Sequence, residues 1–336
     1  MLKYCETTNF MQFVAPMRTV LLFCTLLLLS CQEKKMPTSK QISTLDKIVI
    51  AHRGASGYLP EHTLPAKTMA YAMGPDFIEQ DLVLSKDGVP VVLHDIYLDE
   101  VSDVAEKFPE RKRDDGRFYV IDFNYEELKL LQIFERFDRK TGQQSYPQRF
   151  PKGLSSFQIH SFYEEIELIQ GLNKSTGNSI GIYPEIKAPD FHRKEGQDIA
   201  KRVLDVLKIY GYLNKEDRCI LQCFDAQELH RIRTELNSQL YLVQLIEHKK
   251  EEGALDHYTS YADGIGAWYK EVSPEFINKA QDLGLKIHGY TFRADDLGDF
   301  DNFDALLSYA LDSLKFDGVF TDHPDKVVDF LKENNR

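Results

Sequence analysis

The sequence lacks several features that would point to a specialised class of protein. Its 336 residues include five cysteines and one tryptophan, and 41 basic side chains stand against 53 acidic ones, a formal net charge of -12. Such an acidic chain is not typical of a nucleic-acid-binding protein, because phosphate backbones are bound by clustered Lys and Arg. It also has no fixed-period repeat, which argues against a solenoid. We therefore expect a globular protein with a large core and no nucleic-acid partner.

Long hydrophobic runs are also scarce, and the one that stands out lies near the N-terminus. Arg18 is followed by a largely apolar run of eleven residues, from Thr19 to Leu29. A membrane-spanning helix needs about 20 residues, so this run is too short to span a bilayer. A basic residue, a short apolar stretch and a small residue after it are typical of a secretory signal peptide. We predict that residues 1–30 are such a signal.

The apolar run ends in the tetrapeptide LLSC, which finishes at Cys31. This tetrapeptide resembles the lipobox of bacterial lipoproteins, in which the cysteine is acylated. The resemblance predicts a lipid attached to Cys31, a flexible tether over residues 31–46, and export to the periplasm or cell envelope with the membrane as a partner. An ordinary cleaved signal that contains a cysteine is the alternative.

Two of the five cysteines, Cys219 and Cys223, lie in the body of the chain. Four residues of β-strand would separate them by about 13 Å. A disulfide needs Cα atoms within about 7 Å. The spacing therefore predicts two buried thiols and not a bridge.

Short β-rich runs alternate with helical segments from Ile48 onward. Helix starts are indicated by Ser161 with Glu164, by Asp225 with Glu228, and by Ser273 followed by proline. Alternating strands and helices predict a parallel sheet covered by helices, most economically a (β/α)8 TIM barrel over residues 47–333. A doubly wound sheet is the alternative. The predicted strands are residues 48–52, 77–84, 90–94, 182–186, 219–223, 241–246, 287–292 and 319–321.

Two segments depart from this alternation. The link Ser85–Gly88 is too short for a crossover helix, so its flanking runs should form an antiparallel hairpin that adds an extra strand. A two-residue turn at Asp87 and Gly88 would place His94 opposite Asp81. The charged stretch from about 96 to 160 exceeds ordinary loop length, and we predict a small insertion at one end of the barrel.

Acidic residues within the predicted strands suggest a metal site. Glu79 and Asp81 are two residues apart, so their side chains leave the same face of a strand. Glu185 lies in another short strand, with Lys187 on its face. Three carboxylates suit Ca²⁺ or Mg²⁺ better than zinc. Solvated carboxylates on an edge strand are the alternative.

The end of the first strand carries a second group of candidates. His52 lies at the C-terminal end of a strand, where barrel enzymes have their catalytic residues. Arg53 follows beside a glycine-rich turn, and its planar guanidinium can bind a phosphate through two hydrogen bonds. A structural histidine is the alternative for His52. Glu61 and His62 follow the turn and could line the same site, whereas Thr63 could simply cap the helix over residues 64–73.

Several separated segments together resemble the glycerophosphodiester phosphodiesterase family, in particular its exported bacterial branch. The resemblance runs from about Ile48 to Leu331. The segments are residues 51–63 (AHRGASGYLPEHT), 79–81 (EQD), 94–95 (HD), 184–187 (PEIK), 221–225 (LQCFD) and 320–324 (FTDHP).

The resemblance implies a TIM barrel of the phospholipase C-like phosphodiesterase type. It implies metal-dependent hydrolysis of glycerophosphodiesters to sn-glycerol 3-phosphate and an alcohol, with Ca²⁺ favoured over Mg²⁺. His52 and His94 would take the acid–base roles, and we expect His52 to be the base and His94 the acid. Glu79, Asp81 and Glu185 would bind the metal, and Arg53 and Lys187 would contact the phosphate.

Two other functions fit the same barrel. The protein could be a surface-binding lipoprotein that uses the barrel as a scaffold, or it could cleave lysophospholipids or sphingomyelin. A long apolar groove near the insertion would favour the second of these, and a shallow polar pocket would favour glycerophosphodiesters. A monomer and a homodimer both remain open.

Overall fold

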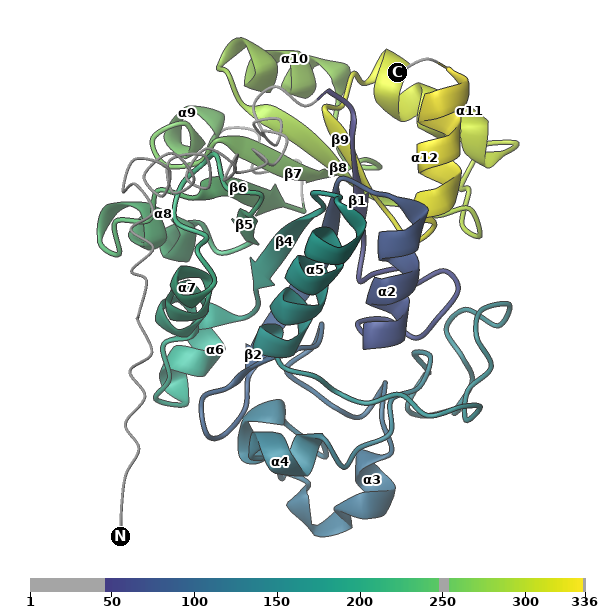
Figure 1. The fold of residues 1–336 in the computed structure, drawn as a ribbon, viewed down its shortest axis with the longest axis vertical. Helices are drawn as coiled ribbons and strands as arrows, with labels where there is room; N and C mark the ends of the chain where they lie inside the picture. The colour runs from purple at the N-terminus through teal and green to yellow at the C-terminus, as the bar shows by residue number, and fades with distance from the viewer. Residues whose placement is uncertain (1–45, 248–253, 335–336) are drawn as a thin grey trace, which may run out of the picture. The chain divides into compact units, whose positions relative to one another are not determined.

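The computed structural model describes residues 46–247 and 254–334, and within these ranges nine strands form a single sheet (Figure 1). The strand order is β1-β9-β8-β7-β6-β5-β4-β2-β3, and an additional pairing of β1 with β2 closes the sheet into a barrel. The strands are β1 Ile48–Ala51, β2 Phe77–Leu84, β3 Pro90–Val92, β4 Gly181–Ile186, β5 Ile220–Cys223, β6 Tyr241–Ile246, β7 Gly264–Trp268, β8 Lys286–Phe292 and β9 Gly318–Thr321.

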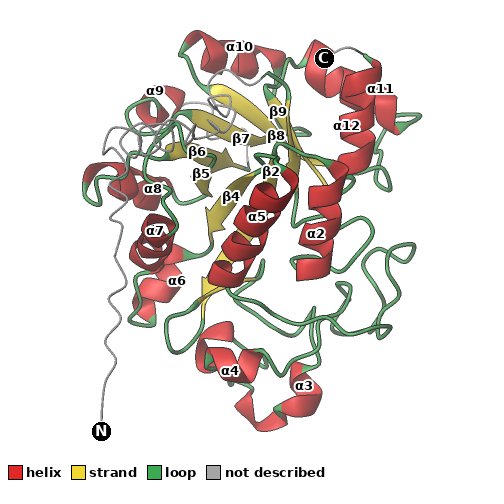
Figure 2. Cartoon of the chain, viewed as in Figure 1, coloured by secondary structure: helices red, strands yellow, loops and turns green. Residues whose placement is uncertain are grey.

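The predicted (β/α)8 barrel with an extra strand is confirmed. Eight parallel strands close the barrel, and β3 pairs antiparallel with the end of β2. Helices surround the strands, except for two short ones that lie apart in the inserted segment (Figure 2). They are α2 Leu64–Met73, α3 Val104–Lys107, α4 Tyr125–Leu128, α5 Phe162–Thr176, α6 Pro189–Lys194, α7 Ile199–Ile209, α8 Ala226–Thr234, α9 Leu255–Tyr258, α10 Pro274–Asp282, α11 Phe303–Ser308 and α12 Pro324–Glu333.

Four helices begin directly after the predicted capping residues. The Ser161 side chain accepts from the Glu164 amide, and Glu164 reaches back to form a full capping box on α5. Thr63 and Ser273 cap α2 and α10. Asp225 caps α8, but the Glu228 side chain bonds Arg193 and Arg231 instead of the helix start, so only half of that predicted box forms.

Strand β7 was missed by the sequence analysis, because glycines at positions 264 and 266 weaken the strand signal. The fold explains both residues. A Cβ at Gly264 would lie 2.8 Å from the Lys286 carbonyl oxygen, and one at Gly266 would lie 2.3 Å from a Leu245 methyl carbon. Close packing inside the barrel therefore requires glycine where strand propensity disfavours it.

The predicted hairpin exists, but its predicted register is wrong by one residue. The observed pairs are Leu82 with Val92 and Val83 with Val91, and the Leu93 amide donates to the Asp81 carbonyl oxygen. The cause is the turn: Gly88 has φ +78°, and the Ser85 amide donates to the Val89 carbonyl oxygen, which leaves a three-residue loop. Strand β3 also ends at Val92, so His94 follows the strand instead of lying within it.

The segment between β3 and α5 holds only α3, α4 and short 3₁₀ turns, and most of it is loop (Figure 2). The arrows of β2 and β4 point toward the side where α3 and α4 lie (Figure 1). This segment packs against Val83 of β2 and Val91 of β3 through a hydrophobic cluster of its own. The cluster contains Val83, Val91, Leu93, Leu98, Val101, Val104, Phe118, Val120, Phe123, Leu128, Leu131, Ile133, Phe157 and Ile159.

Cys219 and Cys223 are buried and free, as predicted. The predicted signal peptide over residues 1–30, the lipid attachment at Cys31 and almost all of the tether over residues 31–46 lie outside the described residues. Among the helices described, none combines the length and hydrophobicity that crossing a bilayer requires.

Candidate active site

The strand register brings the predicted carboxylates together. Asp81 on β2 is the direct neighbour of Glu185 on β4. Glu79 lies two residues before Asp81, and Lys187 two residues after Glu185, so all four side chains share one face of the two strands. The ends of β2 and β4 thus supply three carboxylates and one amine to the same space.

A cavity of about 240 Å³ at this end of the barrel is lined by the seven residues that the family resemblance assigned to catalysis, metal binding and phosphate binding. Five aromatic and apolar residues complete its wall together with the polar side chains of Gln222, Glu247, Thr291 and Arg293. The predicted residues in the lining are His52, Arg53, Glu79, Asp81, His94, Glu185 and Lys187, and the apolar ones are Phe224, Leu245, Trp268, Tyr290 and Phe320.

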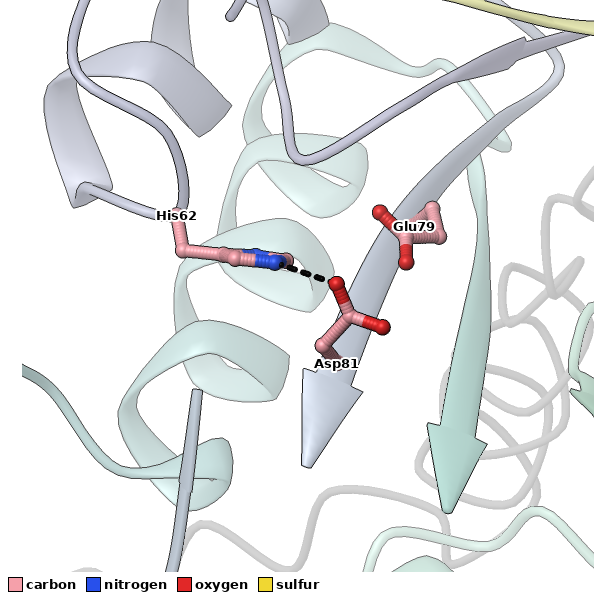
Figure 3. A group of neighbouring side chains, drawn as sticks. All are labelled: His62, Glu79 and Asp81. Atoms are coloured by element: carbon pink, nitrogen blue, oxygen red, sulfur yellow. Dashed lines mark hydrogen bonds and ion pairs between the residues drawn. The ribbon is translucent and has the colours of Figure 1, made fainter. Parts of the chain in front are cut away.

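One cluster of buried side chains has the spacing of a metal site (Figure 3). His62, Glu79 and Asp81 each offer a ligand atom, and these atoms lie within 4.8 Å of one another. His62 Nε2 lies 2.8 Å from Asp81 Oδ2. Glu185 is outside this cluster, and its Oε1 atom lies 2.7 Å from Lys187 Nζ. A histidine therefore joins two of the three predicted carboxylates.

The electrostatics of the three predicted carboxylates fit a bound cation. Burial and the neighbouring charge of Asp81 raise the pKa of Glu79 well above its ordinary value. Burial also raises the pKa of Glu185 to about 8, with a further contribution from Asp81. Asp81 Oδ1 is buried without a hydrogen-bond partner in the described part of the chain. A divalent ion would neutralise these carboxylates and give that oxygen a partner.

The turn after β1 aims the Arg53 backbone at the cluster. Arg53 has φ +57°, and its amide donates to Glu79 Oε2 at 2.6 Å. Gly54 follows with φ +87°, and a Cβ there would lie 2.9 Å from the Ala66 backbone. The guanidinium of Arg53 donates to Glu61 Oε2 at 2.8 Å. Both the strained turn and the close approach to α2 explain the glycine at position 54.

His52 is held by a carboxylate from the last strand. Its Nδ1 atom lies 2.6 Å from Asp322 Oδ1, directly after β9, and its side chain is 12% exposed. Burial and the charge of Arg53 lower the pKa of His52 to about 4 even though Asp322 opposes the shift. The imidazole is therefore neutral at neutral pH.

His94 has the same arrangement with the residue that follows it. Its Nδ1 atom lies 2.8 Å from Asp95 Oδ1, and its side chain is 30% exposed. Burial and the positive charges of Arg53 and Lys187 lower its pKa. With Nδ1 of each histidine bonded to a carboxylate, Nε2 is the ring nitrogen left for chemistry.

Sequence reasoning did not assign roles to Asp95, Asp322, Arg136 or Arg149. Asp322 had a usable signal, because it directly follows the last barrel strand and so lies at the end where His52 lies. Asp95 stands beside His94 in the HD motif. Arg136 and Arg149 lie in loops of the inserted segment, where periodicity carries no information.

Comparison with known proteins assigns the family. Residues 52–326 match the model of the glycerophosphoryl diester phosphodiesterase family. The chain belongs to this family. It is 46% identical to a glycerophosphodiester phosphodiesterase of Haemophilus influenzae, with 85% of this chain and 90% of that protein covered. A glycerophosphodiester phosphodiesterase of Treponema pallidum is 38% identical, with 85% and 92% covered.

Solved structures of phosphodiesterases share the fold. An Oleispira antarctica phosphodiesterase, solved with the product sn-glycerol 3-phosphate, has a TM-score of 0.62 at 21% identity, covering 85% of this chain and 97% of that one. A Thermotoga maritima glycerophosphodiester phosphodiesterase has a TM-score of 0.55 at 22% identity, covering 84% and 97%. The expectation of a phosphodiester hydrolase on a TIM barrel is confirmed.

Proposed function

We propose that the protein hydrolyses glycerophosphodiesters to sn-glycerol 3-phosphate and an alcohol, with a bound divalent cation and two-histidine catalysis. The observation that carries this proposal is the shared cavity, in which His52 and His94 line the same space as Glu79, Asp81 and Glu185. The structurally similar Oleispira antarctica enzyme holds sn-glycerol 3-phosphate, which supports the same product here.

In this proposal the two histidines move protons in opposite directions. The Nε2 atom of His52 removes a proton from the attacking hydroxyl as the new P–O bond forms. The Nε2 atom of His94 gives a proton to the leaving alkoxide as the old P–O bond breaks, so His94 must be protonated at this step although burial, Arg53 and Lys187 lower its pKa. Each transfer contributes about 10²- to 10⁴-fold to the rate. The lowered pKa of His52, about 4, keeps it unprotonated and ready to act as the base.

The positive side chains in the cavity suit a phosphodiester. Its phosphate carries one negative charge, and attack at phosphorus builds more on the oxygens. Arg53 and Lys187 both line the cavity and would stabilise that growing charge. The cation would be held by Glu79 and Asp81 together with His62 or Glu185, and the family resemblance favours Ca²⁺ over Mg²⁺. A bound cation would add positive charge at the phosphate.

The pocket on the side of the insertion favours glycerophosphodiesters over lysophospholipids or sphingomyelin. This pocket of about 260 Å³ also opens onto both histidines. Its other lining residues are mainly charged and polar, where a fatty acyl chain would need an apolar groove. They are Arg53, Ser56, Glu61, Arg136, Tyr146, Arg149, Arg293 and Asp322.

The decisive experiment measures release of glycerol 3-phosphate from glycerophosphocholine. Wild type should turn over, and His52→Ala and Glu79→Ala should fold and lose at least about 10²-fold in rate. Treatment with EDTA should abolish turnover, and added Ca²⁺ should restore it. Turnover that survives the chelator would contradict the metal assignment, and full activity of His52→Ala would contradict the acid–base assignment.

The attacking hydroxyl can come from water or from the glycerol of the substrate itself, and ³¹P NMR separates the two routes. The internal route passes through a cyclic phosphate, which gives its own resonance during turnover. We expect this resonance to be absent if water attacks directly, and its accumulation would establish the internal route.

We also propose that the protein is exported and lipid-anchored at Cys31. The support is the LLSC tetrapeptide that follows a short apolar run. Metabolic labelling with a radioactive fatty acid should mark wild type and leave Cys31→Ser unlabelled, while turnover by the purified variant stays unchanged. Equal labelling of both would contradict the anchor. A surface-binding role on the same barrel would require a partner retained by the inactive His52→Ala variant.

A further inference from the structure

The inserted segment reaches the first histidine through an arginine and an aspartate. Arg149 donates from Nη2 to Asp322 Oδ2 at 2.7 Å, while Asp322 Oδ1 lies 2.6 Å from His52 Nδ1. The side chains of Arg149 and Asp322 are only 4% and 2% exposed. The three groups therefore form a buried chain that starts in the insertion and ends at a histidine of the barrel.

The second histidine has a chain of the same design. Arg136 donates from Nη1 to Asp95 Oδ2 at 2.7 Å, and Asp95 Oδ1 lies 2.8 Å from His94 Nδ1. In both chains one oxygen of the carboxylate faces the imidazole and the other faces a guanidinium. Both arginines come from the same loop between α4 and α5.

We propose that Arg136 and Arg149 are positioning residues that connect the insertion to the acid–base pair of the proposed function. An ionised carboxylate that accepts the Nδ1 proton fixes the imidazole in the tautomer whose Nε2 faces the cavity. An arginine on the second oxygen keeps that carboxylate ionised and correctly turned. The insertion thereby orients both histidines through their carboxylate partners.

Further contacts show that each arginine organises the wall of the site. Arg149 also donates to Asp295 at 2.8 Å and to the Ser56 carbonyl oxygen at 3.2 Å, and Ser56 Oγ donates to the His52 carbonyl oxygen. Arg136 donates to Glu61 Oε1 at 2.6 Å. Glu61 in turn accepts from Arg53, so Arg136 also secures the guanidinium that would meet the phosphate.

The two hydrogen-bonded series differ in whether the aspartate keeps a guanidinium partner when the arginine of the insertion is lost. Arg293, from the barrel, also donates to Asp322 Oδ2 at 2.7 Å. Asp322 therefore keeps one guanidinium in Arg149→Met. Within the described residues, Arg136 is the arginine that bonds Asp95. We expect the larger loss of activity in Arg136→Met.

The test compares Arg136→Met and Arg149→Met with Arg113→Met. Arg113 also lies in the insertion and pairs with Asp122 and Glu195, neither of which contacts a histidine of the site. Each positioning variant should lose about 10- to 100-fold in kcat, because a misplaced catalytic group costs about that much. Arg149→Met should leave KM nearly unchanged, whereas Arg136→Met should also raise KM, because Arg136 supports Arg53 through Glu61. Lysine at either position should restore part of the loss, and Arg113→Met should keep wild-type kcat.

A double-mutant cycle shows whether Arg149 acts through Asp322. In an Asp322→Asn background, Arg149→Met should cause little further loss, because the chain is already broken. An equal loss in both backgrounds would overturn the inference, and so would wild-type kcat in both arginine variants.

Imidazole ¹⁵N NMR separates the inference from the proposed function. Wild-type His52 and His94 should show a protonated Nδ1, and each methionine variant should mix the tautomers of its own histidine. This readout needs no turnover. Failure of wild type to release glycerol 3-phosphate would overturn the proposed function, whereas unchanged tautomers in the variants would overturn only the positioning role.

Discussion

The two ends of the barrel interior are built from the same strands but hold opposite kinds of side chain. On β2, Phe77 packs into an apolar cluster, and Glu79 and Asp81 follow on the same face. On β4, Tyr183 belongs to the cluster, and Glu185 follows it into the cavity. The complete cluster is Ile48, Ile50, Phe77, Tyr183, Ile220, Tyr241, Val243 and Phe320.

This contrast shows how one sheet divides stability from chemistry. Burial of the aromatic end stabilises the fold by removing apolar surface from water. The acidic end has the opposite effect, since burial and mutual repulsion raise the pKa values of Glu79 and Glu185. The stability gained from the apolar cluster at one end of each strand offsets the cost of burying the carboxylates at the other end, where the substrate would bind.

The largest effect is expected from a substitution within the apolar cluster. Phe77 is fully buried and meets Tyr183 edge to face, with ring centroids 6.0 Å apart. Phe77→Ala should lower the free energy of unfolding by about 3–5 kcal/mol because it leaves a cavity. The folded fraction should keep kcat near that of wild type, as measured by urea unfolding beside steady-state kinetics. A stable variant with lost activity would show that the two ends are not separable.

The next effect concerns a buried ion pair behind the acidic end. Lys67 Nζ lies 3.1 Å from Glu165 Oε1, with both side chains fully buried, and it also donates to the Glu79 carbonyl oxygen. Burial alone would raise the pKa of Glu165, but Lys67 and the hydrogen bond from His160 lower it to about 2 from an ordinary 4.5.

A carboxyl whose folded-state pKa is depressed contributes stability above its unfolded pKa. The contribution of Glu165, about 3 kcal/mol, should therefore be present above pH 4.5 and lost as the pH falls toward 2. We expect Glu165→Gln to be less stable than wild type at pH 7, with the difference shrinking across that window. Urea unfolding of both proteins from pH 7 to pH 2 measures the difference. A constant difference over that range would refute the assignment.

Cation binding should offset the repulsion between the buried carboxylates and so stabilise the folded protein. A ligand at 100 times its dissociation constant raises the free energy of unfolding by about 2.7 kcal/mol. Added Ca²⁺ should therefore raise the Tm of EDTA-treated wild type and leave Glu79→Gln almost unchanged. Glu127→Gln is the matched control, because Glu127 pairs with Arg111 on the surface and should leave the Ca²⁺ response intact. An equal Tm shift in wild type and Glu79→Gln would place the ion elsewhere.

The two ends also differ in how well the sequence predicts them. The apolar and acidic positions along β2 and β4 follow from alternation, since residues two apart share a face. Strand β7 did not follow, because close packing at Gly264 and Gly266 is a property of the finished barrel. The hairpin register was off by one residue, because the left-handed conformation of Gly88 adds a residue to the turn.

The partners of the catalytic candidates were the hardest part of the site to predict. Asp322 lies 270 positions from His52 along the chain, and only closure of the barrel through β1 and β9 brings the two together. Arg149 reaches Asp322 from an irregular loop. Local patterns identify residues with chemical potential, whereas their pairing depends on long-range topology.

The smallest expected effect compares two helix caps that differ in their distance from the site. Thr63 accepts from the Ala66 amide at 3.3 Å, and Ser273 accepts from the Phe276 amide at 3.1 Å. Replacing either by alanine should cost about 1 kcal/mol, because one helix-end donor loses its partner. Thr63 also donates to the Pro60 carbonyl oxygen and directly follows His62, which bonds Asp81.

Thr63→Ala should therefore lower kcat as well as stability, because the loop that carries His62 loses an anchor, whereas Ser273→Ala should lower stability alone. Steady-state kinetics of both variants at matched folded concentration makes the comparison. If both caps leave kcat unchanged, the loop before α2 is held by other contacts, such as the bond from the His62 amide to the Arg53 carbonyl oxygen. The acidic end would then depend on its own network and not on the helix that follows it.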